Sequence, residues 1–156
     1  MQKIIFLDID GVLTSGNNFI LSRDKFQIIA DLCKTSGIRL VLSSSWRNFE
    51  WANTVKELSS GSNAELFNII IPYIVGITPR NYHLSRGGEI ELFLDYIKTG
   101  AFPHLYDTGY FNGEDIDYII VDDAEVEPYQ YSHHIKTDMF TGLEEEHIIK
   151  IVKYFN

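Results

Sequence analysis

An apolar run near the start of the chain, residues 3–7, places the strongest constraint on the fold. It contains no alternation of apolar and polar residues, which is typical of a strand buried on both faces, as in a parallel sheet. The run ends in two aspartates, Asp8 and Asp10, with one residue between them, and Gly11 follows at once. Parallel strands are joined by crossovers that usually contain a helix, so such a strand predicts helices in the following segments.

The rest of the chain alternates strands and helices. We expect further strands over residues 38–42, within 66–79, over 117–123 and over 133–137, and helices over about 24–36, 48–59, 86–99 and 142–155. This order predicts an α/β fold with a mostly parallel central sheet, a Rossmann-like three-layer sandwich. No repeat, linker or low-complexity tract interrupts it, and the simplest expectation is one domain over residues 1–156.

Two of these helices carry end signals. Ser85 and Gly100 stand where the cap residues of the 86–99 helix are expected, and Thr141 and Glu144 have the spacing of a capping box for the last helix. His133 and His134 are adjacent within the last expected strand, which predicts that they lie on opposite faces of it.

Composition restricts the class of protein. The chain has 156 residues, 45% of them apolar, with a formal net charge of −9, and this charge argues against a broad basic surface for coating DNA or RNA. A single cysteine, Cys33, excludes an intrachain disulfide and fits a reducing compartment. With no secretory signal and no apolar run approaching 18 residues, we expect a cytoplasmic protein without a membrane span.

Polar residues end three of the expected strands. They are Asp8 and Asp10, then the serines of "SSSW", and then Asp122 and Asp123. Ligands bind beyond the carboxyl ends of strands in open parallel sheets, and acids gathered there would repel each other unless a hard cation such as Mg²⁺ joined them. Arg86, at the start of a helix, supplies a positive counterpart. Together these groups suit the handling of a phosphate.

Four motifs in order resemble those of the haloacid dehalogenase (HAD) superfamily of phosphohydrolases. They are "DIDGVLT", the serines of "VLSSSW", the arginine of "SRGGEI" and the acidic pair of "IIVDD". The ordered set spans most of the chain and implies a HAD-like fold. Within the superfamily, "SSWR", "RGGEI" and "VDD" look most similar to small domains of nucleic-acid end repair, including the phosphatase part of polynucleotide kinase–phosphatase proteins.

The resemblance implies catalytic roles for the acids. Asp8 would attack phosphorus and form an aspartyl-phosphate, and Asp10 would protonate the leaving oxygen and then activate water. Asp122 would complete a Mg²⁺ site with Asp8 and the backbone carbonyl of Asp10. Asp123 is the alternative ligand or a support for this site.

The resemblance also implies two phosphate-binding groups. A strand-end serine would donate a hydrogen bond to the phosphoryl group, and we favour Ser44 over Ser43 while keeping both. Arg86 would neutralise phosphoryl charge in place of the more usual lysine, with Arg80 as a weaker candidate.

The spacing between motifs leaves no room for a large cap domain, only for a short flap near residues 11–22. An open site could receive a phosphate on the end of a large molecule, such as an oligonucleotide or a protein. The resemblance to end-repair domains favours a phosphorylated nucleotide or polynucleotide end as substrate. The net charge of −9 opposes this expectation, because a polynucleotide needs phosphate contacts. A small phosphometabolite, a phosphoprotein and a catalytically silent binding protein on the same fold remain the alternatives.

Overall fold

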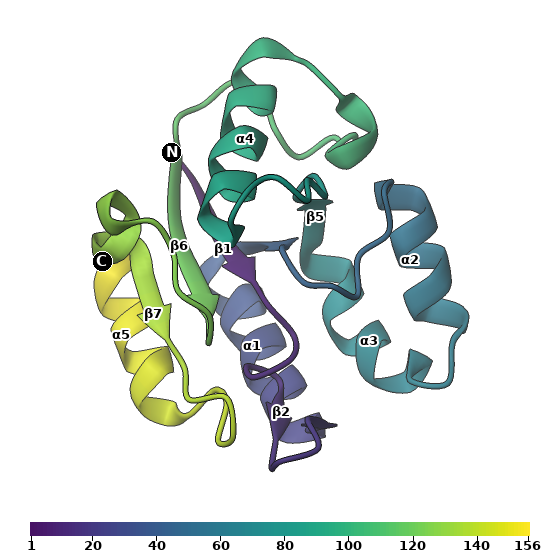
Figure 1. Ribbon diagram of the computed structural model, residues 1–156, viewed down its shortest axis with the longest axis vertical. Coiled ribbons are helices and arrows are strands. Elements are labelled where there is room, and N and C mark those ends of the chain that lie inside the picture. Colours follow the sequence, from purple (N-terminus) through teal and green to yellow (C-terminus); the bar gives the residue numbers. More distant parts are fainter.

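A five-stranded sheet forms the centre of the protein, whose computed structural model describes residues 1–156 (Figure 1). The strand order is β5-β4-β1-β6-β7, and every neighbouring pair is parallel. The strands are β1 (Gln2–Leu7), β4 (Arg39–Leu42), β5 (Ile74–Ile77), β6 (Ile116–Asp122) and β7 (His134–Lys136). The expected α/β fold is confirmed, with a sheet that is parallel throughout.

Helices cover both faces of this sheet. They are α1 (Arg23–Ser36), α2 (Trp51–Ser60), α3 (Ala64–Ile70), α4 (Arg86–Thr99) and α5 (Glu145–Phe155), with three short 3₁₀ helices, η1 (Ile71–Tyr73), η2 (Pro103–Leu105) and η3 (Pro128–His133). The chain moves outward from β1 to β4 and β5, and then returns past β1 to β6. Because crossovers between parallel strands are right-handed, this reversal places α1–α3 on one face and α4 on the other. Every helix is too short or too polar to span a bilayer.

Aromatic side chains fill the core on the two faces of the sheet. The Phe6 ring of β1 makes edge contacts with Phe93 of α4 and Tyr118 of β6, at centroid distances of 5.7 and 5.6 Å. In the helix layer of α1 and α3, Phe26 meets Phe67 at 5.3 Å. These contacts bury β1, the strand that leads into the two aspartates, and fix its position.

The flap expected after the first motif is a small hairpin of β2 (Thr14–Ser15) and β3 (Ile20–Leu21). It rests on the turn that precedes α5, since Gly16 N–H donates to Phe140 O at 2.7 Å and Leu143 N–H donates to Val12 O at 2.7 Å. The segment between β4 and α4 is used by α2, α3 and β5, so the cap is minimal, as expected.

The start of α5 differs from the prediction. The N-cap is Glu144 rather than Thr141, and Glu144 forms its capping box with His147. The backbone of Leu143 is hydrogen-bonded to the flap, so residues 141–143 are held in a turn and the helix begins after them.

The expectation for the two adjacent histidines was also wrong. His133 ends η3, and only His134 lies in β7. The His133 ring stacks on Tyr118 with a centroid distance of 4.4 Å, so it packs at the end of the aromatic core.

The start of α2 also differs from the prediction. The helix begins at Trp51, three residues later than expected, because Asn48 N–H donates to the Thr54 hydroxyl and forms a turn there.

Candidate active site

The carboxyl ends of β1, β4 and β6 meet where the strand order reverses, which is the usual ligand position in an open α/β sheet. Sheet hydrogen bonds continue just beyond the strand ends. Asp8 N–H donates to Val121 O at 3.1 Å, and Ser43 N–H donates to Leu7 O at 3.0 Å. The backbone of the first two motifs is therefore held by the sheet itself.

Three carboxylates come together at this edge. One oxygen from each of Asp8, Asp122 and Asp123 lies within 4.8 Å of the others. Asp8 is 5% exposed and Asp122 is fully buried. Asp8 Oδ1 accepts from Ile9 N–H and Asp122 Oδ1 from Ala124 N–H, but Asp122 Oδ2 is buried with no hydrogen-bond partner.

The electrostatics of this cluster fit a bound cation. Burial, and then the neighbouring charge of Asp122, raises the pKa of Asp8 to about 8, although Arg86 opposes the shift. Burial likewise raises the pKa of Asp122. A buried carboxylate oxygen without a partner is costly unless another group satisfies it. An oxygen-preferring cation such as Mg²⁺ would do so, and these three acids suit it as ligands.

Arg86 is the cation that the structure brings to the acids. It is the first residue of α4, whose N-cap Ser85 accepts a hydrogen bond from Gly88 N–H at 3.0 Å, as expected. Its Nε lies 3.4 Å from Asp122 Oδ2 without hydrogen-bond alignment, and Nη1 lies 3.9 Å from Asp8 Oδ1. The helix start thus directs both positive charge and backbone N–H groups to the strand ends.

The two buried serines after β4 have different partners. The Ser43 hydroxyl accepts from Arg86 Nη1 at 3.4 Å, which places it beside the acid cluster. The Ser44 hydroxyl accepts from Trp46 N–H at 3.2 Å and holds the local turn. The hydrogen bonds therefore associate Ser43, rather than the favoured Ser44, with the other candidate residues.

Asp10 lies at the same edge, but its side chain is outside the cluster of three carboxylates. Its Oδ1 accepts a hydrogen bond from the Trp46 indole N–H at 3.2 Å, and the side chain is partly exposed. Through this bond Trp46 orients Asp10.

Gly11 is a residue whose role the sequence did not reveal. Its φ is +79°, and a Cβ built on it would lie 2.4 Å from Cγ of Asp123. Its N–H donates to the buried Thr14 hydroxyl at 2.8 Å. The glycine of the D-x-D-G motif therefore gives Asp123 the space to approach Asp8.

A buried ion pair of Arg47 and Glu89 supports the site from the side. Arg47 donates to Ser44 O, to Thr78 O and, at 2.8 Å, to Glu89 Oε2. It thereby joins the ends of β4 and β5 to α4. The motif "RGGEI" contains Glu89, yet nothing in the spacing indicated its partner 42 positions earlier. Arg80, the weaker candidate for the phosphate site, forms no contact with the acids and instead donates to Arg47 O at 3.0 Å.

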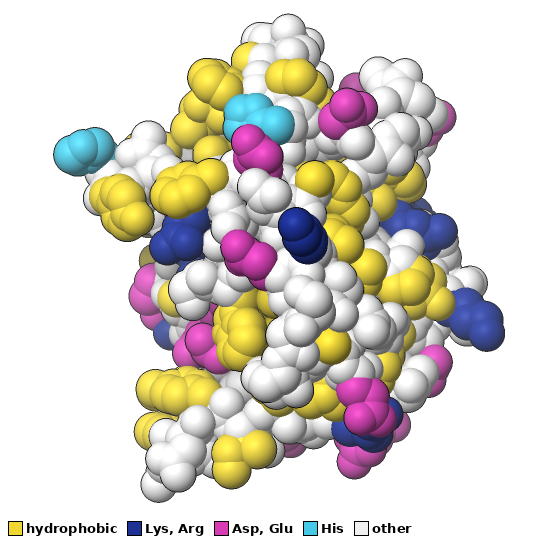
Figure 2. Space-filling view, turned by 90° about the vertical axis from the view of Figure 1, so that its right-hand side faces the viewer, with side chains coloured by type: hydrophobic (Ala, Val, Ile, Leu, Met, Phe, Trp, Pro, Cys, Tyr) yellow, Lys and Arg dark blue, Asp and Glu magenta, His cyan; other side chains and the backbone are white.

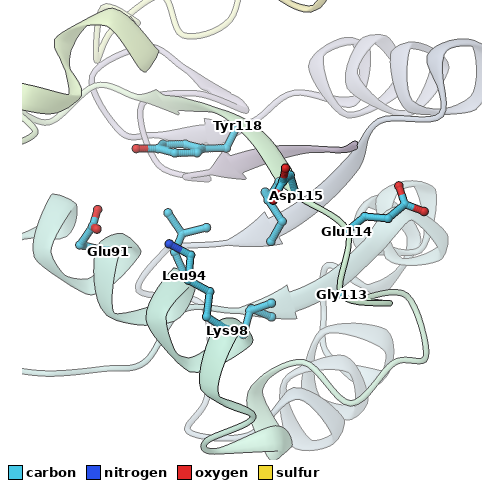
Figure 3. A pocket seen from close by; sticks show the side chains of 9 residues that line it. Glu91, Leu94, Lys98, Gly113, Glu114, Asp115 and Tyr118 are labelled. Atoms are coloured by element: carbon cyan, nitrogen blue, oxygen red, sulfur yellow. The ribbon is translucent and has the colours of Figure 1, made fainter.

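The largest cavity, of about 510 Å³, lies away from this chemistry. It sits between α4 and the start of β6, at the opposite edge of the sheet, where Figure 3 shows Glu91, Lys98 and Leu94 facing Glu114, Asp115 and Tyr118. Three acids and one lysine disfavour a phosphate there. On the face nearest α2 and α3, Lys and Arg side chains are scattered among Asp and Glu, without a continuous basic surface (Figure 2).

Comparison with known proteins identifies the family. No curated protein and no solved structure matches the chain closely enough to count as a relative. The family described as the HAD domain in Swiss Army Knife RNA repair proteins matches residues 4–148. This match covers all four motifs and nearly the whole sheet. The chain therefore belongs to the family of HAD domains of Swiss Army Knife RNA repair proteins.

Proposed function

We propose that the protein is a Mg²⁺-dependent phosphomonoesterase that acts on phosphorylated nucleotide or polynucleotide ends. The observation that carries this proposal is the buried, incompletely satisfied pair Asp8 and Asp122 beside Arg86. The match to RNA repair proteins supports a nucleic-acid substrate. Asp8, Asp122 and Asp123 would hold the Mg²⁺, with the backbone carbonyl of Asp10, and the ion would supply positive charge that favours the ionised acids.

In this mechanism, a carboxylate oxygen of Asp8 attacks phosphorus, and the bond between phosphorus and the leaving oxygen breaks. Asp10, in its acid form, gives its proton to that oxygen. A water molecule then attacks the aspartyl-phosphate and loses a proton to Asp10, which releases inorganic phosphate and restores Asp8. The Trp46 indole holds the Asp10 carboxyl in place through the bond described above.

Arg86 and Ser43 are assigned to the phosphoryl oxygens. Arg86 already lies between the acids and Ser43, so it can neutralise the charge of a group bound there. The Ser44 hydroxyl instead accepts from Trp46 N–H and has no hydrogen bond with Arg86. We therefore expect Ser43→Ala to reduce kcat/KM with a phosphomonoester more than Ser44→Ala does, in parallel assays of the two variants.

The central test uses p-nitrophenyl phosphate. The wild-type chain should hydrolyse it with Mg²⁺, lose activity in EDTA and regain it when Mg²⁺ is returned. Asp8→Asn should abolish turnover, whereas Asp31→Asn, the same change on the exposed surface of α1, should leave it intact. Near-normal turnover by a verified Asp8→Asn protein would contradict the mechanism. A folded, Mg²⁺-saturated wild type that hydrolyses no phosphomonoester would contradict the function.

The physiological substrate is tested by comparing kcat/KM at fixed salt for terminally phosphorylated oligonucleotides, mononucleotides, a phosphopeptide and a sugar phosphate. We expect the nucleotide substrates to be preferred. A tenfold preference for the sugar phosphate would reject the nucleic-acid end as the substrate and leave the phosphatase chemistry in place.

A further inference from the structure

A second cavity adjoins the acid cluster and shares Arg86 with it. Its volume is about 310 Å³, near the lower limit for ligand pockets. We call it the arginine pocket; it is lined by Ser45, Arg47, Arg80, Asn81, Tyr82, Leu84, Arg86 and Glu89. Since Arg86 also contacts Asp8 and Asp122, a group in this pocket lies directly beside the phosphate to be hydrolysed.

The arginine pocket has an excess of positive charge in an acidic protein. Three arginines and one glutamate line it, while the whole chain carries a net charge of −9. The pKa of Arg47 is lowered, first by burial and also by the nearby cations Arg86 and Arg80, although Glu89 opposes this. A concave site with an excess of one sign of charge concentrates ligands of the opposite sign.

Within the pocket, Arg80 is the cation without an ionic partner. Arg47 is paired with Glu89, and Arg86 with the two aspartates, but no ion pair of the structure includes Arg80. It donates one hydrogen bond, from Nη1 to Arg47 O, and its guanidinium lies 5.5 Å from the centre of the Phe49 ring. These contacts hold the side chain in place while other N–H donors stay available for an anion.

An aromatic ring is exposed at the same pocket. Tyr82 is 83% exposed, although burial is favourable for a ring of this size. Its loop is anchored, because Asn81 N–H donates to the same Glu89 oxygen that binds Arg47. A flat ring on an anchored loop beside a guanidinium is the arrangement on which a nucleobase stacks in single-stranded nucleic-acid sites.

Building on the proposed phosphatase activity, we propose that the arginine pocket binds the nucleotide adjacent to the hydrolysed phosphate. Arg80 contacts the neighbouring phosphodiester, and Tyr82 stacks on a base. Arg86 binds the phosphate that is hydrolysed. The guanidinium of Arg80 has no ionic partner, so it indicates a binding site for a second phosphate. The substrate is accordingly the phosphorylated end of a strand rather than a mononucleotide, and the local pocket resolves the conflict between such a substrate and the acidic charge of the chain.

The test compares Arg80→Gln and Tyr82→Ala with Lys34→Gln, which removes the same charge from the exposed last turn of α1. Each protein is assayed with a terminally phosphorylated hexaribonucleotide and with p-nitrophenyl phosphate, which cannot reach a second subsite. We expect both pocket variants to lower kcat/KM at least tenfold for the hexanucleotide and less than threefold for p-nitrophenyl phosphate. Lys34→Gln should leave kcat/KM unchanged for both substrates. Thermal unfolding checks that each variant folds.

Salt dependence gives an independent readout. Loss of one phosphate contact on a single strand should reduce the slope of log(kcat/KM) against log[salt] by roughly 0.7 in Arg80→Gln. Equal losses on both substrates, an unchanged slope, or a wild-type preference for the mononucleotide would overturn the proposal.

A binding measurement separates failure of the pocket from failure of the phosphatase. The fluorescence anisotropy of a labelled, phosphorylated hexanucleotide is followed with Asp8→Asn protein in Mg²⁺, with and without Arg80→Gln. Weaker binding in the double variant supports the pocket even if the wild type lacks turnover. Equal binding overturns it even if p-nitrophenyl phosphate is hydrolysed.

Discussion

The Asp8 carboxyl is buried beside other carboxyl groups, and its ionisation therefore lowers the free energy of unfolding. Its pKa in the fold, about 8, lies above the ordinary value of 3.8 because of burial and then Asp122. Without a cation, the folded state therefore binds more protons than the unfolded chain at pH values between 3.8 and about 8. The free energy of unfolding must fall as pH rises across that window.

Asp8→Asn should consequently stabilise the metal-free protein. In EDTA at pH 8, its melting temperature should exceed that of the wild type, because a neutral amide replaces a buried charge. Mg²⁺ should raise the wild-type melting temperature by mass action, by an amount equivalent to about 2.7 kcal/mol at a hundredfold excess over Kd, and should raise that of Asp8→Asn less. Calorimetric scans with and without Mg²⁺ measure both effects. A destabilised Asp8→Asn protein in EDTA would contradict the electrostatic argument.

Gly11 and Gly16 offer a matched pair for testing the approach of Asp123. Both have positive φ, at +79° and +81°, but a Cβ on Gly16 meets nothing within 4 Å. Gly11→Ala and Gly16→Ala therefore share the backbone strain, and only Gly11→Ala displaces the Asp123 carboxyl. We expect Gly11→Ala alone to weaken Mg²⁺ binding, measured by titration calorimetry. Equal Mg²⁺ affinities in the two variants would show that the displacement has no effect.

Among the elements, α5 carries a titratable cap. His147 is 5% exposed, and its Nδ1 accepts from Glu144 N–H at 2.9 Å. Its pKa is lowered, first by burial and further by Lys150 and Lys25, while Glu146 and Glu144 act in the opposite direction. A lowered pKa means that the unfolded chain binds more protons as pH falls below about 6.5, so this part of the stability is present above that pH and is lost below it.

His147→Gln should reduce this pH dependence. Glutamine caps well at the same position of η3, where Gln130 pairs with Glu127, so the variant keeps its cap without a proton to gain. The difference in urea midpoint between pH 7.5 and pH 5 should be smaller in His147→Gln than in the wild type. Identical differences in the two proteins would assign the acid sensitivity to other groups.

Sequence reasoning located the elements and strand ends well, because those signals are local. The two acidic pairs follow apolar strands directly, and Ser85 and Gly100 flank α4 at the expected positions. What it missed depends on long-range pairs. Arg47 pairs with Glu89, and the turn before α5 is held by the flap, so the N-cap of α5 is Glu144 and not Thr141. No local spacing records such partners.

For the molecule as a whole, Phe93 has a central role, since it joins α4 to Phe6 of the central strand and to Tyr106 and Phe111 beyond the helix. Phe93→Ala should lower the free energy of unfolding by about 3–5 kcal/mol, a large share of the ~5–15 kcal/mol of a typical domain. Urea unfolding measures the change, and Ile149→Ala on the exposed side of α5 serves as the control. A loss below about 1 kcal/mol would show that the core rearranges to fill the space left by the Phe93 ring.

The strand order also determines when each edge of β1 can pair during synthesis. One side of β1 pairs with β4, which follows within about 40 residues, but the other side waits for β6. At ~5–20 residues per second, the ribosome needs roughly 5–20 s to pass from Leu7 to Ile116. Throughout that interval the nascent chain has an apolar strand with at least one unpaired edge. The acid cluster is also incomplete, because Asp122 and Asp123 are still to be made, so neither Mg²⁺ nor substrate can assist the early stages of folding.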